Sequence, residues 1–214
     1  MINKKQGLFL LLITLMLSCN SRKSGQEAGD EMATLDKEAQ LFAEHAQHDS
    51  VLLAITEEVL TAIKSRDYHR LSEHFHPGEG VRFSPYGYID TVHHVHFAAG
   101  EFLQQVEDDQ PMLWGSYDGT GKDIEMSLEA YFGKFVYEVD FLNAEQRSVN
   151  ELLGKGNSLI NIQQVYPGAD FTESYFSGFE EKYGGMDWRS LRLVFRTEQG
   201  VPKIVGIVHD QWTI

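Results

Sequence analysis

The chain has one cysteine, few basic residues and one long apolar run, and each scarcity excludes a class of protein. Cys19 stands alone among 214 residues, so no disulfide framework can form within the chain. Eighteen Lys and Arg residues stand against thirty-two Asp and Glu, a formal net charge of −14. So acidic a surface repels phosphate backbones, and we expect neither a nucleic-acid partner nor a polybasic contact with a membrane.

The apolar run lies at the N-terminus. A basic head, "MINKK", precedes "GLFLLLITLML", which is shorter than a membrane-spanning helix needs, and Ser18 and Cys19 follow. This pattern resembles a bacterial lipoprotein signal peptide over residues 1–18. The resemblance implies lipidation of Cys19 and an anchor in the cell envelope, expected at the outer membrane, with the domain in the periplasm or at the cell surface. A secretory peptide cleaved nearby is the first alternative, and an anchor that is not cleaved is the second.

Residues 19–48 are predicted to connect this anchor to a single domain at residues 49–214. The stretch "NSRKSGQEAGD" is small and polar, as expected of a tether, and residues 31–48 suggest a loosely amphipathic helix. Asp49 or Ser50 then predicts the cap of a stronger helix. Its apolar residues recur at three- and four-residue steps and share one face: Leu52, Ile55, Val59, Leu60 and Ile63.

Further elements follow in an order typical of an α+β domain. Asp67 predicts the cap of a second, short helix, and Pro85 interrupts the strand after it. A helix at residues 97–107, a strand from Met112 into a glycine-rich turn, and a buried-face helix within residues 127–141 come next. Three strand candidates close the chain: "INIQQVY", "DFTESYF" and a hairpin that turns at Gln199 and Gly200.

Two stretches resemble known families. "IKSRDYHRLSEHFHPGEGVRFSPYG" resembles the start of the nuclear transport factor 2-like superfamily, which implies N-terminal helices packed on a curved, mostly antiparallel sheet that forms a cone with a pocket. The segment at residues 115–163 adds an inserted helix to that pattern. "YPGADFTESYF", "YGGMDWRSLRLVF" and "VGIVHDQWTI" resemble a family of uncharacterised secreted or lipid-anchored bacterial proteins. Neither resemblance supplies a catalytic residue.

The closing hairpin carries charged and aromatic groups at the ends away from its turn. A three-residue loop would pair Arg189 with His209, and a two-residue loop would pair it with Asp210. In both registers Asp187 and Arg189 share a face with apolar residues, which predicts that Arg189 rims a pocket, unless it forms a structural ion pair at the sheet end. The full set of predicted binding residues is Arg82, Tyr86, Tyr88, Trp114, Asp187, Arg189, His209, Asp210 and Trp212.

Other motifs carry less chemistry. His93, His94 and His96 lie within four residues, and two of them would face one side of an extended segment, with His74 or His76 completing a zinc or copper site. We favour a surface loop instead. "DGTGKD" departs from a phosphate-binding loop at both ends. The acid–base candidates His209, Asp210, Asp187 and Asp118 form no reaction signature, so no metal or cofactor is expected.

These observations favour a noncatalytic, lipid-anchored envelope protein whose cone-like domain binds a small ligand or a protein partner. The first alternative is an isomerase-like or hydrolase-like enzyme that uses a carboxylate or histidine in the same pocket. The second is a metal-binding lipoprotein built on the histidine cluster.

Overall fold

A computed structural model describes residues 23–213, with side chains from Asp36 onward. The chain divides into two compact units, Met1–Ala46 and Gln47–Ile214. The predicted signal peptide and the lipidation site Cys19 lie outside the described residues.

Helix α1 (Lys23–Lys64) runs through the end of the first unit and into the second without interruption. The predicted cap at Asp49 or Ser50 is therefore wrong, and residues 23–30, assigned to a polar tether, are helical. The physical reason is composition, since residues 30–64 contain neither Gly nor Pro and are rich in Ala, Glu, Gln and Leu, which are strong helix formers. None of the helices within residues 23–213 is both long and apolar enough to span a bilayer.

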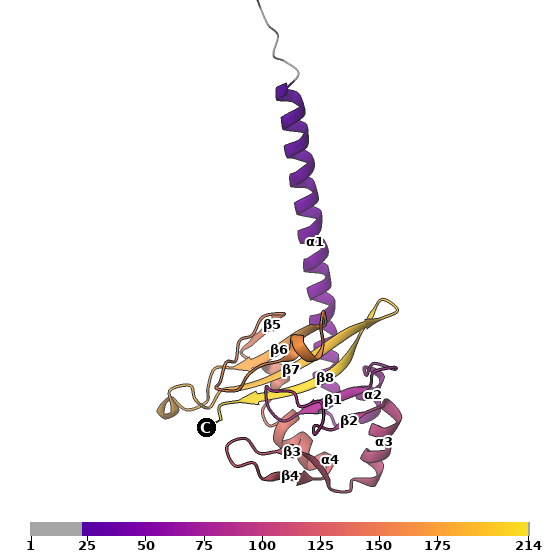
Figure 1. Ribbon diagram of the computed structural model, residues 1–214, viewed down its shortest axis with the longest axis vertical. Helices are drawn as coiled ribbons and strands as arrows, with labels where there is room; N and C mark the ends of the chain where they lie inside the picture. Colours follow the sequence, from indigo (N-terminus) through magenta and orange to yellow (C-terminus); the bar gives the residue numbers. More distant parts are fainter. Residues whose placement is uncertain (1–22, 214) are drawn as a thin grey trace, which may run out of the picture. The chain divides into compact units, whose positions relative to one another are not determined.

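The second unit is built on an open, curved sheet in the order β2-β1-β8-β7-β6-β5 (Figure 1). Its neighbours pair antiparallel, except β1 and β8, which run parallel. The strands are β1 (Val81–Ser84), β2 (His96–Phe97), β5 (Gln146–Val149), β6 (Asp170–Phe176), β7 (Arg189–Glu198) and β8 (Val201–Gln211). The predicted α+β class with a mostly antiparallel sheet is confirmed.

The helices between these strands are short. They are α2 (Tyr68–Glu73), α3 (Ala99–Asp108), α4 (Leu128–Tyr131), the π-helical turn η1 (Phe132–Val136), the 3-10 turns η2 (Phe141–Asn143) and η3 (Glu181–Tyr183), and α5 (Ile162–Val165). Asp67 caps α2 as predicted, because its carboxylate accepts the Arg70 N–H at 3.0 Å. The inserted helix is α4 with η1, and it follows a separate hairpin of β3 (Met112–Ser116) and β4 (Asp123–Met126).

Each face of the sheet has its own apolar core. Leu191, Leu193 and Phe195 of β7 pack with α1, α2, α3 and η1, in a core dense with aromatic rings. On the other face, Val194 and Val205 pack with α5. The predicted strand "INIQQVY" is wrong, because its residues 162, 165 and 166 have helical spacing, and α5 uses them to cover this second face.

The closing hairpin combines a tight turn with a bulge. Gln199 and Gly200 have φ angles of 52° and 83°, as a two-residue type I′ turn requires, and Phe195 pairs with Ile204. A register shift between Val194 and Phe195 then places Arg189 opposite Gln211. Both predicted pairings of Arg189 are therefore wrong, since neither anticipated the bulge.

Candidate functional site

The polar ends of β7 and β8 divide between the two faces of the sheet. Along β7, Arg189 alternates with Arg192, and along β8, His209 alternates with Asp210, because successive strand residues point to opposite sides. Arg189 and His209 lie on the face of Leu191, whereas Arg192 and Asp210 lie on the face of Val194. Two separate ionic clusters result.

The first, the Arg189 cluster, consists of Arg189, Glu138 and His209. Glu138 follows η1, and its Oε1 lies 2.8 Å from Arg189 Nε and 2.6 Å from His209 Nε2. His209 Nδ1 lies 2.7 Å from the Pro85 carbonyl oxygen. The side chains of Arg189 and Glu138 are 24% and 19% exposed, so water reaches one side of the cluster.

Both ring nitrogens of His209 are engaged by oxygen atoms. A carbonyl oxygen can only accept, so Nδ1 carries a proton. Burial raises the pKa of Glu138, but its contacts with His209 and Arg189 outweigh burial and lower that pKa below its ordinary value. Glu138 is therefore ionised near neutral pH, and its carboxylate contacts the second ring nitrogen of His209, Nε2. With both ring nitrogens engaged by acceptors, His209 offers no free lone pair to a substrate, which disfavours it as a general base.

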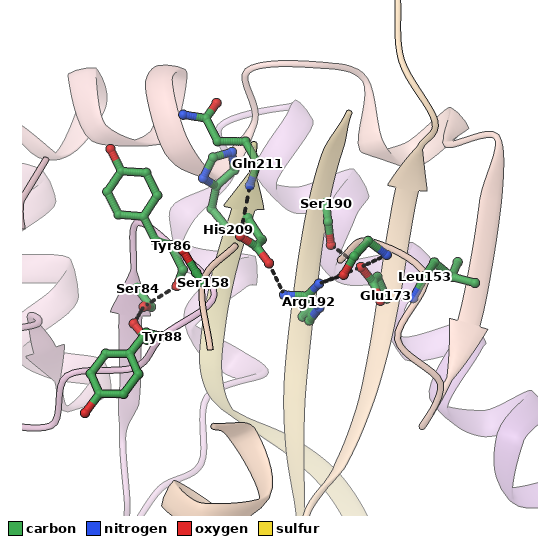
Figure 2. A network of polar contacts seen from close by, with 12 residues as sticks. Ser84, Tyr86, Tyr88, Leu153, Ser158, Glu173, Ser190, Arg192, His209 and Gln211 are labelled. Carbon is green, nitrogen blue, oxygen red and sulfur yellow. Dashed lines mark hydrogen bonds and ion pairs between the residues drawn. The ribbon is translucent and has the colours of Figure 1, made fainter. Parts of the chain in front are cut away.

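The second, the Arg192 cluster, consists of Arg192, Glu173, Asp210 and Ser190, and it is closed to solvent. Arg192 lies between the other strands' carboxylates, 2.9 Å from Glu173 Oε1 and 2.9 Å from Asp210 Oδ2 (Figure 2). Ser190 also donates to Glu173. The Arg192 and Glu173 side chains are fully buried, and Asp210 is 2% exposed.

Two loop segments seal the Arg192 cluster. The Leu153 and Gly154 N–H groups donate to Glu173 at 2.7 and 3.0 Å, and Arg192 donates to the Gly154 carbonyl at 2.8 Å. Gly87 approaches so closely that a Cβ there would lie 2.6 Å from Asp210 Oδ2. Burial raises the pKa of Asp210 despite the nearby guanidinium. Because no ligand can reach these groups, the cluster is a structural element that joins three strands and two loops.

An open pocket of about 330 Å³ lies between the turn after β1 and the turn after β3. We call it the tyrosine pocket after Tyr86, Tyr88 and Tyr117, which line it together with Asp90, His93, His94, Ser116, Asp118, Ser158 and three glycines. Tyr86 and Tyr88 project from the segment after Ser84 to the side away from Arg192 (Figure 2). Tyr88 is 51% exposed, and the Tyr86 hydroxyl contacts the backbone of Asp118.

One wall of the tyrosine pocket is held by hydrogen bonds among Ser84, Asp90 and His94. The Asp90 N–H donates to His94 Nδ1 at 3.1 Å, and Ser84 Oγ lies 3.0 Å from the same nitrogen. Burial lowers the pKa of His94 to about 4, so the ring is neutral near pH 7. Asp90 itself accepts from the Val92 and His93 backbone and contacts His93 Nδ1 at 2.7 Å, which lowers its pKa to about 2.

The Arg189 cluster and the tyrosine pocket are neighbours. The Phe135 ring packs edge-on against both, with its centroid 5.7 Å from that of His209 and 5.9 Å from that of Tyr86. Among the described residues, those that line the pocket do not include Arg189 or His209. The predicted link between them and a pocket is therefore indirect.

The other predicted binding residues lie elsewhere. Trp114 is fully buried, stacks on Tyr131 at 3.8 Å and donates its indole N–H to the Met126 carbonyl. Arg82 lines a different hollow and donates to the His94 carbonyl. Asp187 accepts the N–H groups of residues 179 and 180, and Trp212 is 37% exposed.

The clustered histidines take three separate partners. His93 contacts Asp90, His94 contacts Ser84, and His96 contacts the Glu79 carbonyl. Within residues 23–213, side chains of His, Cys, Asp and Glu form no group of three suited to hold a metal. The prediction that the cluster is mostly a surface loop is right for His93, whose side chain is 71% exposed, and His96 is exposed as well, whereas His94 is partly buried in the pocket wall.

Sequence reasoning missed Glu138, Glu173 and Arg192, which lie in apolar contexts along the chain. Glu173 interrupts "DFTESYF" and Arg192 interrupts "SLRLVF", and each is a charged residue in the middle of a predicted buried strand. That signal predicts a buried ion pair between neighbouring strands. Comparison of the chain with family models, curated proteins and solved structures found no match.

Proposed function

We propose that this chain is a lipid-anchored protein of the bacterial cell envelope that binds a small polar ligand in the tyrosine pocket. The observation that carries the proposal is the pocket itself, whose volume of about 330 Å³ falls at the lower end of the range for small-molecule sites. Its wall combines aromatic rings with hydroxyl, imidazole and carboxylate groups, which suits recognition of a polar ligand.

The same wall supports binding without a reaction. Asp90 makes three internal contacts and His94 makes two. Proton exchange with a ligand would therefore require either residue to break hydrogen bonds within the protein. His209, the other acid–base candidate nearby, has both nitrogens engaged. The enzyme alternative would need one of these contacts to break during catalysis.

We also propose that the curved sheet and its helices represent the nuclear transport factor 2-like cone. The order of elements supports this, because helices come first and a curved, mostly antiparallel sheet follows. The aromatic side chains of Phe83, Phe102 and Trp114 pack into the core on the helix-covered face. The proposed ligand site is accordingly placed beside the sheet end and not within that core.

A thermal-shift screen of metabolites and envelope fragments tests the binding proposal. A true ligand should raise the melting temperature of the wild-type protein and should have no effect on Ser116→Trp, in which a large ring fills the pocket. Thr120→Trp, on the exposed turn that follows Ser116 but outside the pocket wall, is the control and should keep the response. Ligands whose effect survives Ser116→Trp would place the site elsewhere.

The anchor proposal rests on the basic head, the apolar run and Ser18 with Cys19. Cys19→Ala should leave the precursor unprocessed or move the protein from the membrane fraction to the soluble fraction. Unchanged mass and fractionation of this variant would overturn lipidation.

A further inference from the structure

The tyrosine pocket offers aromatic faces and negative charge to a ligand. Tyr86, Tyr88 and Tyr117 contribute three rings, and Asp90 and Asp118 contribute two carboxylates from opposite turns. Of the described residues that form its wall, none is Lys or Arg. The full chain has fourteen more acidic than basic groups, so the field around the pocket also attracts cations.

Asp90 supplies charge more than hydrogen-bonding capacity. Its Oδ1 accepts the N–H groups of Val92 and His93 at 2.8 and 3.0 Å, and its Oδ2 contacts the His93 ring. With its pKa lowered to about 2, chiefly by the His93 contact, it remains ionised throughout the ordinary pH range. A ligand that needs free acceptors gains little from this carboxylate, whereas a ligand that needs a negative field gains from it.

The wall also holds two histidines, His93 in contact with the Asp90 carboxylate and His94, and His94 does not oppose a cation. His94 is neutral near pH 7, because burial lowers its pKa to about 4, and its Nδ1 accepts the Asp90 N–H. The Tyr86 hydroxyl is occupied by the backbone of Asp118. The hydroxyl of Tyr117 accepts a hydrogen bond from Lys134 at 2.8 Å. The hydroxyls of two of the three rings are thus engaged, and what these rings offer a ligand is mainly their faces.

Tyr117 already contacts one cation of the chain, from outside the pocket wall. The Lys134 ammonium lies 4.6 Å from the centroid of the Tyr117 ring, within the range of a cation–π interaction. Lys134 does not belong to the pocket wall, so it leaves the pocket's own space open.

We propose that the tyrosine pocket recognises an organic cation, with a quaternary ammonium or alkylammonium group as the recognised part. The proposal rests on the proposed function, because it names the ligand class of that same site. Ring faces attract an ammonium through their quadrupole, and a quaternary ammonium needs no hydrogen-bond acceptor. A neutral sugar is the rival ligand, and several of the acceptors and hydroxyls that it would need are already used in internal contacts.

Isothermal titration calorimetry on the full-length protein in detergent tests this proposal. Choline and tetramethylammonium are the cationic probes, and 3,3-dimethylbutan-1-ol is the control, since it has the shape of choline without the charge. We expect saturable binding of both cations and binding of the neutral control at least about tenfold weaker, the scale of one cation–π contact in a partly desolvated site. Glucose and N-acetylglucosamine are titrated in parallel.

Matched variants locate the binding. Tyr88→Leu removes an exposed ring from the pocket and should weaken choline binding about tenfold, whereas Tyr183→Leu removes an exposed ring from a different loop and should leave it unchanged. Asp118→Asn should weaken choline binding, and Asp123→Asn, on an exposed site of β4, should not. Thermal unfolding of each variant verifies that it is folded.

Each outcome separates the two proposals. Equal binding of choline and its neutral analogue would overturn the cation proposal and leave the pocket as a ligand site. Binding of a sugar that Tyr88→Leu abolishes, without binding of either cation, would have the same meaning. Absence of binding by every probe, together with a negative ligand screen, would overturn the cation proposal and the proposed function together.

Discussion

Two arginines three residues apart on β7 pair with carboxylates in different environments, one partly exposed and one fully buried. Arg189 and Arg192 each contact a carboxylate from another element, but the Arg189 side chain is 24% exposed and the Arg192 side chain is fully buried. Glu173 and Asp210, the partners of Arg192, come from the strands on either side of β7. Glu138, the partner of Arg189, comes from the segment after η1.

The difference shows that burial and not residue type decides the role of an ion pair. Water can replace Arg189 in the Arg189 cluster, because this ion pair is partly exposed, and such pairs contribute little net stability. In the Arg192 cluster two carboxylates share one guanidinium without water, so loss of the guanidinium leaves buried charge uncompensated. The four predictions below test this contrast, in order of decreasing expected effect.

Arg192→Met should cause the largest loss of stability. We expect the free energy of unfolding to fall by about 3–5 kcal/mol, because Glu173 and Asp210 would stay buried without a counter-charge. Urea denaturation monitored by tryptophan fluorescence measures the change. The triple variant Arg192→Met, Glu173→Gln, Asp210→Asn removes all three charges and should recover part of the loss. A single variant that costs less than about 1 kcal/mol would contradict the proposed role.

Glu138→Gln should lower the free energy of unfolding by about 1.5–3 kcal/mol near neutral pH, the scale of hydrogen bonds to a charged group. The pKa of Glu138 in the folded state lies below its ordinary value of 4.5, so the folded state binds fewer protons near that pH. Its contribution is therefore present above pH 4.5 and is lost as the pH falls through the folded-state pKa.

The stability gap between the wild type and Glu138→Gln should accordingly narrow as the pH falls below 4.5. Asp210 gives the opposite slope, because its folded-state pKa is raised, and its ionisation weakens the folded state as the pH rises above its ordinary value of 3.8. Urea denaturation of Glu138→Gln and of the single variant Asp210→Asn across this pH range, each compared with the wild type, measures the two slopes. Parallel slopes would contradict the contrast between the clusters.

Gly87→Ala should cost about 1–3 kcal/mol, the usual range for overpacking, because the new methyl group would meet the buried Asp210 carboxylate at 2.6 Å. Gly100→Ala is the matched control. Nothing lies within 4 Å of a Cβ at Gly100, and the position is in α3, so this change should be neutral or stabilising. Thermal unfolding compares the pair, and equal effects would show that Asp210 yields to the added methyl group.

Arg189→Ala should have the smallest effect on stability, about 0–1 kcal/mol, because the ion pair is partly exposed. The variant should also keep the binding of a tyrosine-pocket ligand, since Arg189 lies outside the pocket wall. Calorimetry with the same probes measures this. If binding is lost while the protein stays folded, the ligand site lies at the Arg189 cluster, as the hairpin pattern by itself predicted.

Local signals predicted the elements that local physics controls. The cap of α2 at Asp67 depends on one side chain and an N–H three residues away. The position of the hairpin turn depends on Gly200, which adopts a positive φ without strain, although the sequence left its loop length open between two and three residues. The alternation of Leu191, Leu193 and Phe195 depends on the strand period. Each of these could be read from a few adjacent residues.

The predictions that were wrong concern places where contacts between distant segments determine the local structure. "INIQQVY" has enough β-branched residues for a strand, but it contains α5. This helix covers a face of the sheet that β7 and β8 form together, and that face cannot be inferred from the segment itself. There the Asn161 side chain, not a strand, bonds the Ile89 N–H and carbonyl at 2.8 and 3.0 Å. The bulge beside Phe195 moved Arg189 away from both predicted partners, and no turn residue indicates it.

The sequence by itself determined the α+β class, the acidic character and the candidate lipidation site, because these depend on composition, periodicity and order along the chain. It also placed Tyr86 and Tyr88 among the predicted binding residues, and both line the tyrosine pocket. Only the tertiary structure decided that they share a wall with Asp118 and Ser158, that Glu138 joins Arg189 and His209, and that Glu173 and Asp210 share Arg192. The physical reason is that burial and charge pairing depend on which segments meet in space, and the distance between two residues along the chain does not indicate whether they meet.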